Sequence, residues 1–131
     1  MLRSSPKIPR ILLLEDEPAV RYLLAESLAR HGYAVLAGES LEDGLSVLAS
    51  PGRESMDLVV TDSHLGRDPA ERNGHLLHAR WRALHPVPPF IFLCGWGDAN
   101  PPPETCCQVY GLAKPFPFPA LLTLVRAVVG P

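Results

Sequence analysis

A short apolar run that ends abruptly in acids limits the folds open to this chain. Residues 11–14 (ILLL) are all apolar, and Glu15, Asp16 and Glu17 follow without a break. A continuously apolar run of this length is typical of a strand whose two faces are both covered by helices. Ionised carboxyl groups are rarely buried without a partner, because removing a charge from water is costly. The strand must therefore either reach the surface at these acids or meet a cation there.

The rest of the chain alternates between similar runs and helical patterns. Apolar runs predict further strands at residues 33–37, 56–61 and 90–93, and a fifth strand that ends at residue 113. Apolar residues at helical spacing predict helices at residues 18–32, 41–49, 76–84 and 119–129. Pro18 suits a first helical position, and Ser40 with Asp43 resembles a capping box at the start of the second helix.

This alternation predicts an α/β fold. Strands and helices that alternate through right-handed crossovers form a doubly wound sheet of five parallel strands with helices on both faces. Three prolines at residues 101–103 cannot stand inside a helix, so a helix between the fourth and fifth strands is predicted to be short or irregular. With 131 residues, the chain is expected to form a single domain over residues 10–130, after a flexible lead-in over residues 1–9.

Composition argues against several classes of function. The formal net charge of −2 provides no basic surface for direct binding to nucleic acid. No apolar run approaches the roughly 20 residues of a membrane span, and the protein is expected to be cytoplasmic, as a monomer or weak dimer. The three cysteines, Cys94, Cys106 and Cys107, are odd in number and lack C-x-x-C spacing, which argues against disulfides and against structural zinc.

Polar residues directly follow four of the predicted strands. Glu15 and Asp16 follow the first strand, Asp62 the third, Cys94 the fourth and Lys114 the fifth. The carboxyl ends of parallel strands meet at one edge of a doubly wound sheet, where such folds bind ligands. We therefore expect these five side chains to lie together.

Three carboxylates at one edge of a sheet repel one another. Two unit charges about 4 Å apart cost roughly 4 kcal/mol at an effective dielectric constant of about 20. A divalent cation removes that cost, and carboxylate, carbonyl and phosphoryl oxygens are the ligands that Mg²⁺ prefers. An aspartate can also act as the nucleophile that forms an acyl phosphate, and Asp62 is placed to do so, with Lys114 as a compact charge for a phosphoryl oxygen.

Several short motifs together resemble a known family. The acid pair in LLLEDE is followed in order by DLVVTDSHLG, NGHLLHAR, FIFLCGWGD and LAKPF. Their order and spacing make residues 10–129 similar to the receiver domain of two-component response regulators. The resemblance implies a flavodoxin-like sheet with strand order 2-1-3-4-5.

The resemblance also implies a role for each site residue. Glu15 and Asp16 would bind Mg²⁺, and Asp62 would accept a phosphoryl group from a sensor histidine kinase or a histidine phosphotransfer protein. The main-chain carbonyl of His64 would complete the metal shell, and Lys114, before a cis peptide bond, would contact the phosphoryl group. Such a domain takes part in phosphorelay signal transduction by docking to a further, unidentified protein, and is not itself an enzyme.

Two positions depart from the family pattern. Cys94 stands where the family has Thr or Ser, and a thiol is a poor hydrogen-bond donor to a phosphoryl oxygen. Gly111 stands where the family has an aromatic residue, and Tyr110 lies one position earlier. Because a hydrogen bond to a charged group is worth about 1.5–3 kcal/mol, losing the hydroxyl weakens the phosphorylation-driven shift about ten- to hundredfold.

Two alternatives therefore stay open beside a working receiver. The first is a degenerate receiver that keeps the fold and acts as a phosphorylation-independent interaction module. The second is a Mg²⁺-dependent phosphatase or nucleotide-binding enzyme on the same fold, although no G-x-x-x-x-G-K-[ST] or G-x-G-x-x-G loop follows the first strand.

Other notable residues are predicted to have structural roles. His75, His78 and Trp81 suit helix packing, and Cys106 and Cys107 lack a basic neighbour that would make them reactive. Helical spacing predicts the following core residues in the first and last helices: Leu23, Leu24, Leu28, Leu121, Leu122 and Val125.

Overall fold

The computed structural model describes residues 7–66, 73–84, 86–95 and 109–130 of the chain. The described elements, in chain order, are β1 (Arg10–Leu14), α1 (Pro18–Arg30), β2 (Ala34–Gly38), α2 (Leu41–Leu48), a 3₁₀ helix (Pro51–Ser55), β3 (Leu58–Asp62), α3 (Asn73–Arg82), β4 (Phe90–Cys94), β5 (Val109–Ala113) and α4 (Phe118–Val129).

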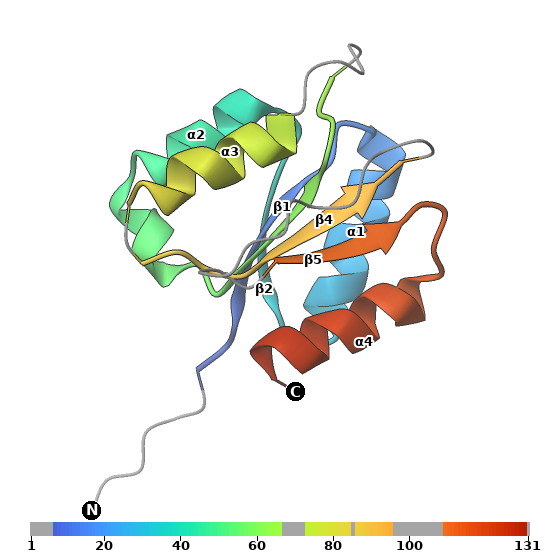
Figure 1. Ribbon diagram of the computed structural model, residues 1–131. Helices are drawn as coiled ribbons and strands as arrows, with labels where there is room; N and C mark the ends of the chain where they lie inside the picture. The colour runs from blue at the N-terminus through green and yellow to red at the C-terminus, as the bar shows by residue number, and fades with distance from the viewer. Residues whose placement is uncertain (1–6, 67–72, 85, 96–108, 131) are drawn as a thin grey trace, which may run out of the picture.

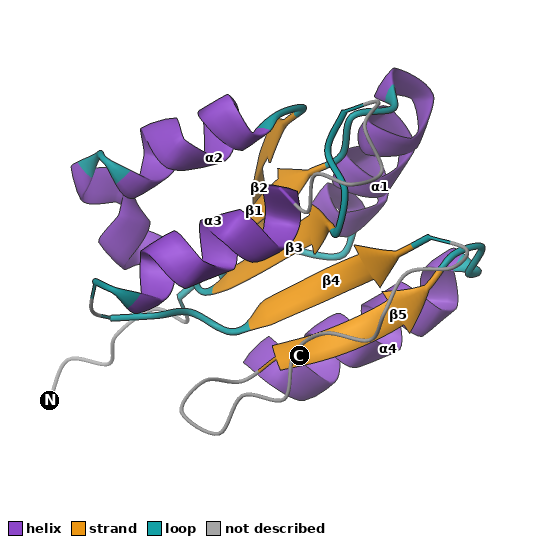
Figure 2. Cartoon of the chain, turned by 45° about the horizontal axis from the view of Figure 1, so that its top comes forward, coloured by secondary structure: helices purple, strands orange, loops and turns teal. Residues whose placement is uncertain are grey.

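The five strands form one parallel sheet in the order β2-β1-β3-β4-β5. The helices lie in two layers: α2 and α3 cover one face of this sheet, and α1 and α4 cover the other (Figure 1). Figure 2 shows all the strand arrowheads at the same edge, with β2 and β5 as the outer strands. The predicted doubly wound α/β fold and its strand order are confirmed.

Each buried strand contributes alternate side chains to two separate cores, as the period of two in a strand requires. Leu12 and Leu14 of β1 belong to the cluster beneath α2 and α3, which also contains the fully buried Trp81. Ile11 and Leu13 belong to the cluster beneath α1 and α4. Burial on both faces explains why the first apolar run does not alternate with polar residues.

The helix ends follow their local sequence signals. Ser40 Oγ accepts a hydrogen bond from Asp43 N at 3.2 Å, so the predicted cap at the start of α2 is confirmed. Pro18 is the first residue of α1, a position whose N–H has no partner within the helix, so the missing N–H of proline costs nothing there. Gly32 adopts a φ of 95°, a conformation that favours glycine, and turns the chain from α1 into β2.

Leu23 is not a core residue, contrary to the sequence prediction. Leu24 and Leu28 are buried, whereas Leu23 is 62% exposed. Neighbouring helical positions are about 100° apart around the axis, so the face that buries Leu24 and Leu28 turns Leu23 towards solvent. The predicted third helix also ends earlier than expected, at Arg82, which leaves Leu84 outside it.

Two sequence predictions lie outside the described residues. The short or irregular helix between β4 and β5 was predicted for a segment within residues 96–108, and most of the lead-in falls within residues 1–6. Within the described parts of the chain, every helix is too short or too polar to span a lipid bilayer.

Candidate phosphoacceptor and metal site

The site lies at the edge of the sheet where the strands end. Glu15 directly follows β1 and is fully buried, while Asp62, the last residue of β3, is 3% exposed. Lys114 directly follows β5, and its ammonium group lies 2.7 Å from Asp62 Oδ1 and 3.2 Å from Glu15 Oε2. The cation that the buried acids require is therefore supplied, at least in part, by the protein itself.

The surroundings of Asp62 and Lys114 shift the pKa values of both groups. Burial, reinforced by a hydrogen bond with Glu15, raises the pKa of Asp62 from its ordinary value of 3.8 to about 9, against the opposing effect of Lys114. Burial alone would lower the pKa of Lys114, but its hydrogen bond to Asp62 and the charges of both acids outweigh burial and raise it. Ionising Asp62 is therefore unfavourable without a further cation, and a cation bound at this edge would favour the ionised form.

Asp16 completes a group of three acids. Carboxylate oxygens of Glu15, Asp16 and Asp62 all lie within 4.8 Å of one another, which is close enough for a single metal ion to bind all three. Asp16 is exposed, and its Oδ2 accepts a hydrogen bond from Gly66 N at 3.0 Å. These hard oxygen donors suit Mg²⁺.

The loop after Asp62 is held close to the site. Ser63 N donates to Leu93 O at 3.1 Å, and Gly74 N donates to Ser63 O at 3.1 Å. A Cβ atom on Gly74 would lie 2.1 Å from the Asp62 carbonyl oxygen, so only glycine allows α3 to approach β3 this closely. His64, whose carbonyl was predicted to be a metal ligand, is half-buried in the same loop, two residues after Asp62.

Backbone contacts between neighbouring strands fix the position of Lys114. Lys114 N donates to Cys94 O at 2.8 Å, which joins the ends of β4 and β5. The peptide bond from Lys114 to Pro115 is cis, as the resemblance implied. The structure therefore brings Glu15, Asp16, Asp62 and Lys114 together, with His64 and Cys94 beside them.

Two contributors to the site were missed in the sequence. Arg21 Nη1 donates to the Glu15 carbonyl at 2.9 Å and lies 3.8 Å from Glu39 Oε2, so it links the end of β1 to the end of β2. Gly66 supplies the backbone N–H that holds Asp16. A charged residue in the first turns of a helix and a loop glycine are too common for sequence alone to assign them these roles.

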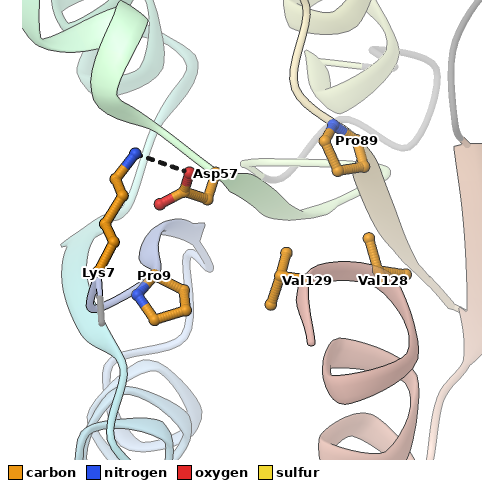
Figure 3. A pocket seen from close by; sticks show the side chains of 6 residues that line it. All are labelled: Lys7, Pro9, Asp57, Pro89, Val128 and Val129. Atoms are coloured by element: carbon orange, nitrogen blue, oxygen red, sulfur yellow. Dashed lines mark hydrogen bonds and ion pairs between the residues drawn. The ribbon is translucent and has the colours of Figure 1, made fainter. Parts of the chain in front are cut away.

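The opposite edge of the sheet contains a different kind of hollow. Lys7 and Asp57 form an ion pair of 3.2 Å there, beside Pro9, Pro89, Val128 and Val129 (Figure 3). Asp57 also accepts a hydrogen bond from Arg10 N at 2.8 Å, so this acid holds the start of β1 in place. A single acid that is already paired makes this hollow a poor candidate for a metal or a phosphoryl group.

Comparisons with known proteins agree with this geometry. The family model of the response regulator receiver domain matches residues 11–126. The chain belongs to the response regulator receiver domain family. The receiver domain is 34% identical to the response regulator protein FleR of Pseudomonas aeruginosa over 119 residues, which are 88% of this chain and 24% of FleR. It thus spans about a quarter of the length of that relative.

Solved receiver structures share this fold. A response regulator receiver protein from Sinorhizobium medicae matches with a TM-score of 0.77 and 24% identity, over 94% of this chain and 95% of that one. The receiver domain of the hybrid histidine kinase CckA matches with a TM-score of 0.70 and 27% identity, over 92% of this chain and 98% of that one. Receiver domains are signalling modules of two-component systems.

Cys94, which stands where the family has Thr or Ser, contacts the core and Ser63. Its side chain is 8% exposed and belongs to the core cluster beneath α2 and α3. Cys94 Sγ lies 3.5 Å from Ser63 Oγ and 3.6 Å from its own acceptor, the Phe92 carbonyl. The thiol is therefore engaged with the core, with Ser63 and with the backbone of its own strand.

Tyr110 does not replace the aromatic residue that is absent at Gly111. Tyr110 pairs with Ile91 and packs against the core beneath α1 and α4, whereas Gly111 pairs with Phe92. A shift of one residue along a strand moves a side chain to the other face of the sheet. The face of β5 that lies over Phe92 therefore has no aromatic side chain at this position.

His75, His78 and Trp81 have the packing roles predicted for them. The His75 ring stacks on Phe92, with ring centroids 4.4 Å apart. His78 is 2% exposed and tilts against Phe90, and Trp81 is fully buried at the edge of the same ring. Cys106 and Cys107 lie outside the described residues.

An open apolar groove of about 610 Å³ borders the site. Lys114 and Gly95 lie at its polar end. Its other lining residues come from α1 and the residue before it, from the segment after β5 and from the start of α4: Glu17, Val20, Leu23, Leu24, Pro115, Phe116 and Phe118. The exposed Leu23 thus lines the same groove as Lys114, the residue that pairs with Asp62.

Proposed function

We propose that this receiver domain accepts a phosphoryl group on Asp62 from a phosphohistidine of a sensor histidine kinase or a histidine phosphotransfer protein. The observation that carries the proposal is the position of the Lys114 ammonium group, between Asp62 Oδ1 at 2.7 Å and Glu15 Oε2 at 3.2 Å. A cation held there can turn to an oxygen of a phosphoryl group attached to Asp62. Residues 10–130 would form the single domain that carries out this function.

Mg²⁺ is the proposed cofactor. The carboxylates of Glu15, Asp16 and Asp62 and the carbonyl of His64 would hold it. When bound, it would offset the charge of the carboxylates and of the phosphoryl oxygens. The donor set fits this role, because the three carboxylates come within 4.8 Å of one another.

The reaction needs the ionised form of Asp62. One carboxylate oxygen of Asp62 attacks phosphorus, and the P–N bond to the donor imidazole breaks. The electron pair of that bond stays on the ring nitrogen, which takes up a proton from solvent, and Asp62 becomes an acyl phosphate. Lys114 orients the transferred group and partly neutralises its charge, while buried Glu15 keeps Lys114 in place.

The partners would meet the domain at the apolar groove beside the site. The groove combines exposed apolar surface on α1 with Phe116 and Phe118, and it opens towards Lys114. A helix that presents a phosphohistidine next to an apolar stripe would bury this surface and bring its phosphorus to Asp62. The phosphorylated domain would then dock to a downstream protein, which remains to be identified by experiment.

Labelling with a small phosphodonor tests the proposal. Acetyl phosphate with Mg²⁺ is expected to add one phosphoryl group to the wild-type protein, as detected by intact mass, and none to Asp62→Asn. Asp57→Asn is the matched control, because Asp57 is an acid at the opposite edge of the sheet. A wild-type protein that stays unlabelled, or an Asp62→Asn variant that is labelled equally, contradicts the proposal.

A second candidate function is a receiver that interacts with partners but does not switch. It is favoured by the engagement of Cys94 with the core and by the packing of Tyr110 on the other face of β5 from the one expected of the family's aromatic residue. Beryllofluoride, which mimics the phosphoryl group, separates the two. Amide shifts that spread beyond the pocket support a switching receiver, and shifts confined to residues around Asp62 support the second candidate.

A further inference from the structure

The outer strand β2 has an edge that the described parts of the chain leave open. In a parallel ladder, the N–H and C=O of one residue point to the same side, and successive residues alternate. Ala34 N donates to Pro9 O at 2.9 Å, and Gly38 O accepts from Glu15 N at 3.0 Å, so these residues face β1. By alternation, the backbone N–H and C=O of Leu36 also point towards β1. The backbone N–H and C=O of Val35 and Ala37 point away from the sheet.

This edge has no protection in its own sequence. Natural edge strands avoid pairing with other chains by means of proline, charged side chains or bulges. The β2 sequence, AVLAG, contains neither proline nor charge and pairs in regular register with β1 along its whole length. Leu36 is 46% exposed on the side of α2, because α2 packs on β1 and α3.

The surface around Leu36 could match the same surface of a second copy in charge. Two shallow hollows of about 220 and 190 Å³ share Leu36, and the first also contains Arg10 whereas the second contains Asp43. Beyond them, the exposed basic residues Arg30 and His31 precede β2, and the exposed acids Glu39 and Glu42 follow it. A two-fold axis that reverses the strand direction would place the basic end of one copy beside the acidic end of the other.

We propose that β2 is a self-association surface, in which two copies of this chain pair antiparallel about a two-fold axis at Leu36. Val35 of one copy then lies opposite Ala37 of the other, and their outward N–H and C=O groups form four hydrogen bonds. Leu36 faces its own copy as a non-hydrogen-bonded pair, the arrangement in which opposite side chains lie closest. The hollow with Arg10 meets the partner hollow with Asp43.

The alternating directions of the backbone groups favour this register. An axis centred on Val35 would place Val35 opposite its own copy and Ala37 opposite a residue outside the strand. An axis centred on Ala37 would do the same with the two residues exchanged. Glu39 N already donates to Asp43 Oδ2 at 2.8 Å, so it cannot extend such a ladder. A contact between two edge strands is small, and interfaces below about 1,200 Å² are weak, so we expect association at about 0.1–1 mM protein.

Sedimentation and NMR across this concentration range test the proposal. The wild-type protein is expected to form dimers, with concentration-dependent shifts at the amides of Val35 and Ala37. Leu36→Lys and Leu36→Glu are each expected to weaken association at least tenfold, because like charges would meet at the axis. An equimolar mixture of the two variants is expected to associate again, since opposite charges then meet.

The matched control is Leu76→Lys on α3, because Leu76 is 42% exposed and distant in sequence from β2. It is expected to associate as the wild type does, and circular dichroism checks that every variant is folded. A wild type that stays monomeric at about 1 mM overturns the proposal. A dimer that Leu36→Lys leaves intact also overturns it. So does a mixture of the two charged variants that stays monomeric, which is the result expected if this edge pairs only with an extended segment of another protein.

Discussion

Lys114 Nζ lies 2.7 Å from Asp62 Oδ1, and these two residues are 52 positions apart in the sequence. The contact joins the ends of β3 and β5, which do not pair with each other but each flank β4. One lysine therefore partly neutralises two buried acids, Asp62 and Glu15. The negative charge left over determines how this site responds to pH and to metal ions.

Asp62→Asn is expected to stabilise the metal-free protein at neutral pH. Burial, with a further contribution from Glu15, raises the pKa of Asp62 from 3.8 to about 9. A folded state that holds a proton more tightly than the unfolded state loses stability as pH rises between those two values. The raised pKa of Lys114 adds stability that is lost only above its ordinary value of 10.5, so it does not mask this trend.

Thermal unfolding with and without Mg²⁺ checks this prediction. Without Mg²⁺, the Tm of the wild type is expected to fall from pH 5 to pH 8 more steeply than that of Asp62→Asn. A gain of about 1–2 kcal/mol would raise the Tm of a domain of this size by several degrees. Saturating Mg²⁺ is expected to reduce the difference, and an equal pH dependence of both proteins would contradict the assigned cause.

Gly74→Ala is expected to be much more damaging than Gly44→Ala. A Cβ atom at Gly74 would lie 2.1 Å from the Asp62 carbonyl oxygen, which is backbone and cannot rotate away. At Gly44 it would meet side-chain methyl groups of Leu77 and Leu14 at 2.8 and 2.9 Å, and these can adjust. Both glycines are buried in helices, so replacing either by alanine brings a similar gain in helix propensity. The difference between the two variants therefore reflects the contacts of the added Cβ atom.

Chemical denaturation measures the difference. Gly74→Ala is expected to lose about 2–3 kcal/mol of unfolding free energy, the cost of overpacking a rigid contact, and Gly44→Ala about 1 kcal/mol or less. Since the clash is with the Asp62 backbone, Gly74→Ala should also slow labelling by acetyl phosphate in protein that is still folded. Equal losses for the two variants would show that α3 can move away from β3.

Cys94→Thr is expected to strengthen the response to beryllofluoride. The thiol now lies 3.5 Å from Ser63 Oγ and 3.6 Å from the Phe92 carbonyl, and a threonine hydroxyl is a better donor to a phosphoryl-like oxygen. One such bond, worth about 1.5–3 kcal/mol, would change the population of the switched state about ten- to hundredfold. NMR should then show amide shifts farther from Asp62 than in the wild type, with Cys94→Ala as the control that lacks the hydroxyl.

The sequence predicted the sheet and the acidic edge because both follow from local patterns. Apolar runs gave the strands, and the residues directly after them had to meet at one edge once the strands were parallel. Leu23 was mispredicted because helical spacing identifies a face but not how far the neighbouring elements cover it. Arg21 and the close approach of Gly74 to Asp62 depend on distances between elements that are distant in sequence, which no local pattern contains.

The exposure of Leu23 leads to the last prediction. Leu23 is 62% exposed in the groove that opens towards Lys114, so it can be shortened without loss of core packing. If a phosphohistidine protein buries this groove, Leu23→Ala removes apolar contact worth about 1–2 kcal/mol. The kcat/KM for transfer from a histidine kinase or phosphotransfer protein that labels the wild type is then expected to fall about tenfold.

Labelling by acetyl phosphate is expected to be unchanged, since a small donor does not cover the groove. Leu76→Ala, at 42% exposure on α3, is the control and should transfer normally. Equal transfer rates for Leu23→Ala and the wild type would place the donor on another surface.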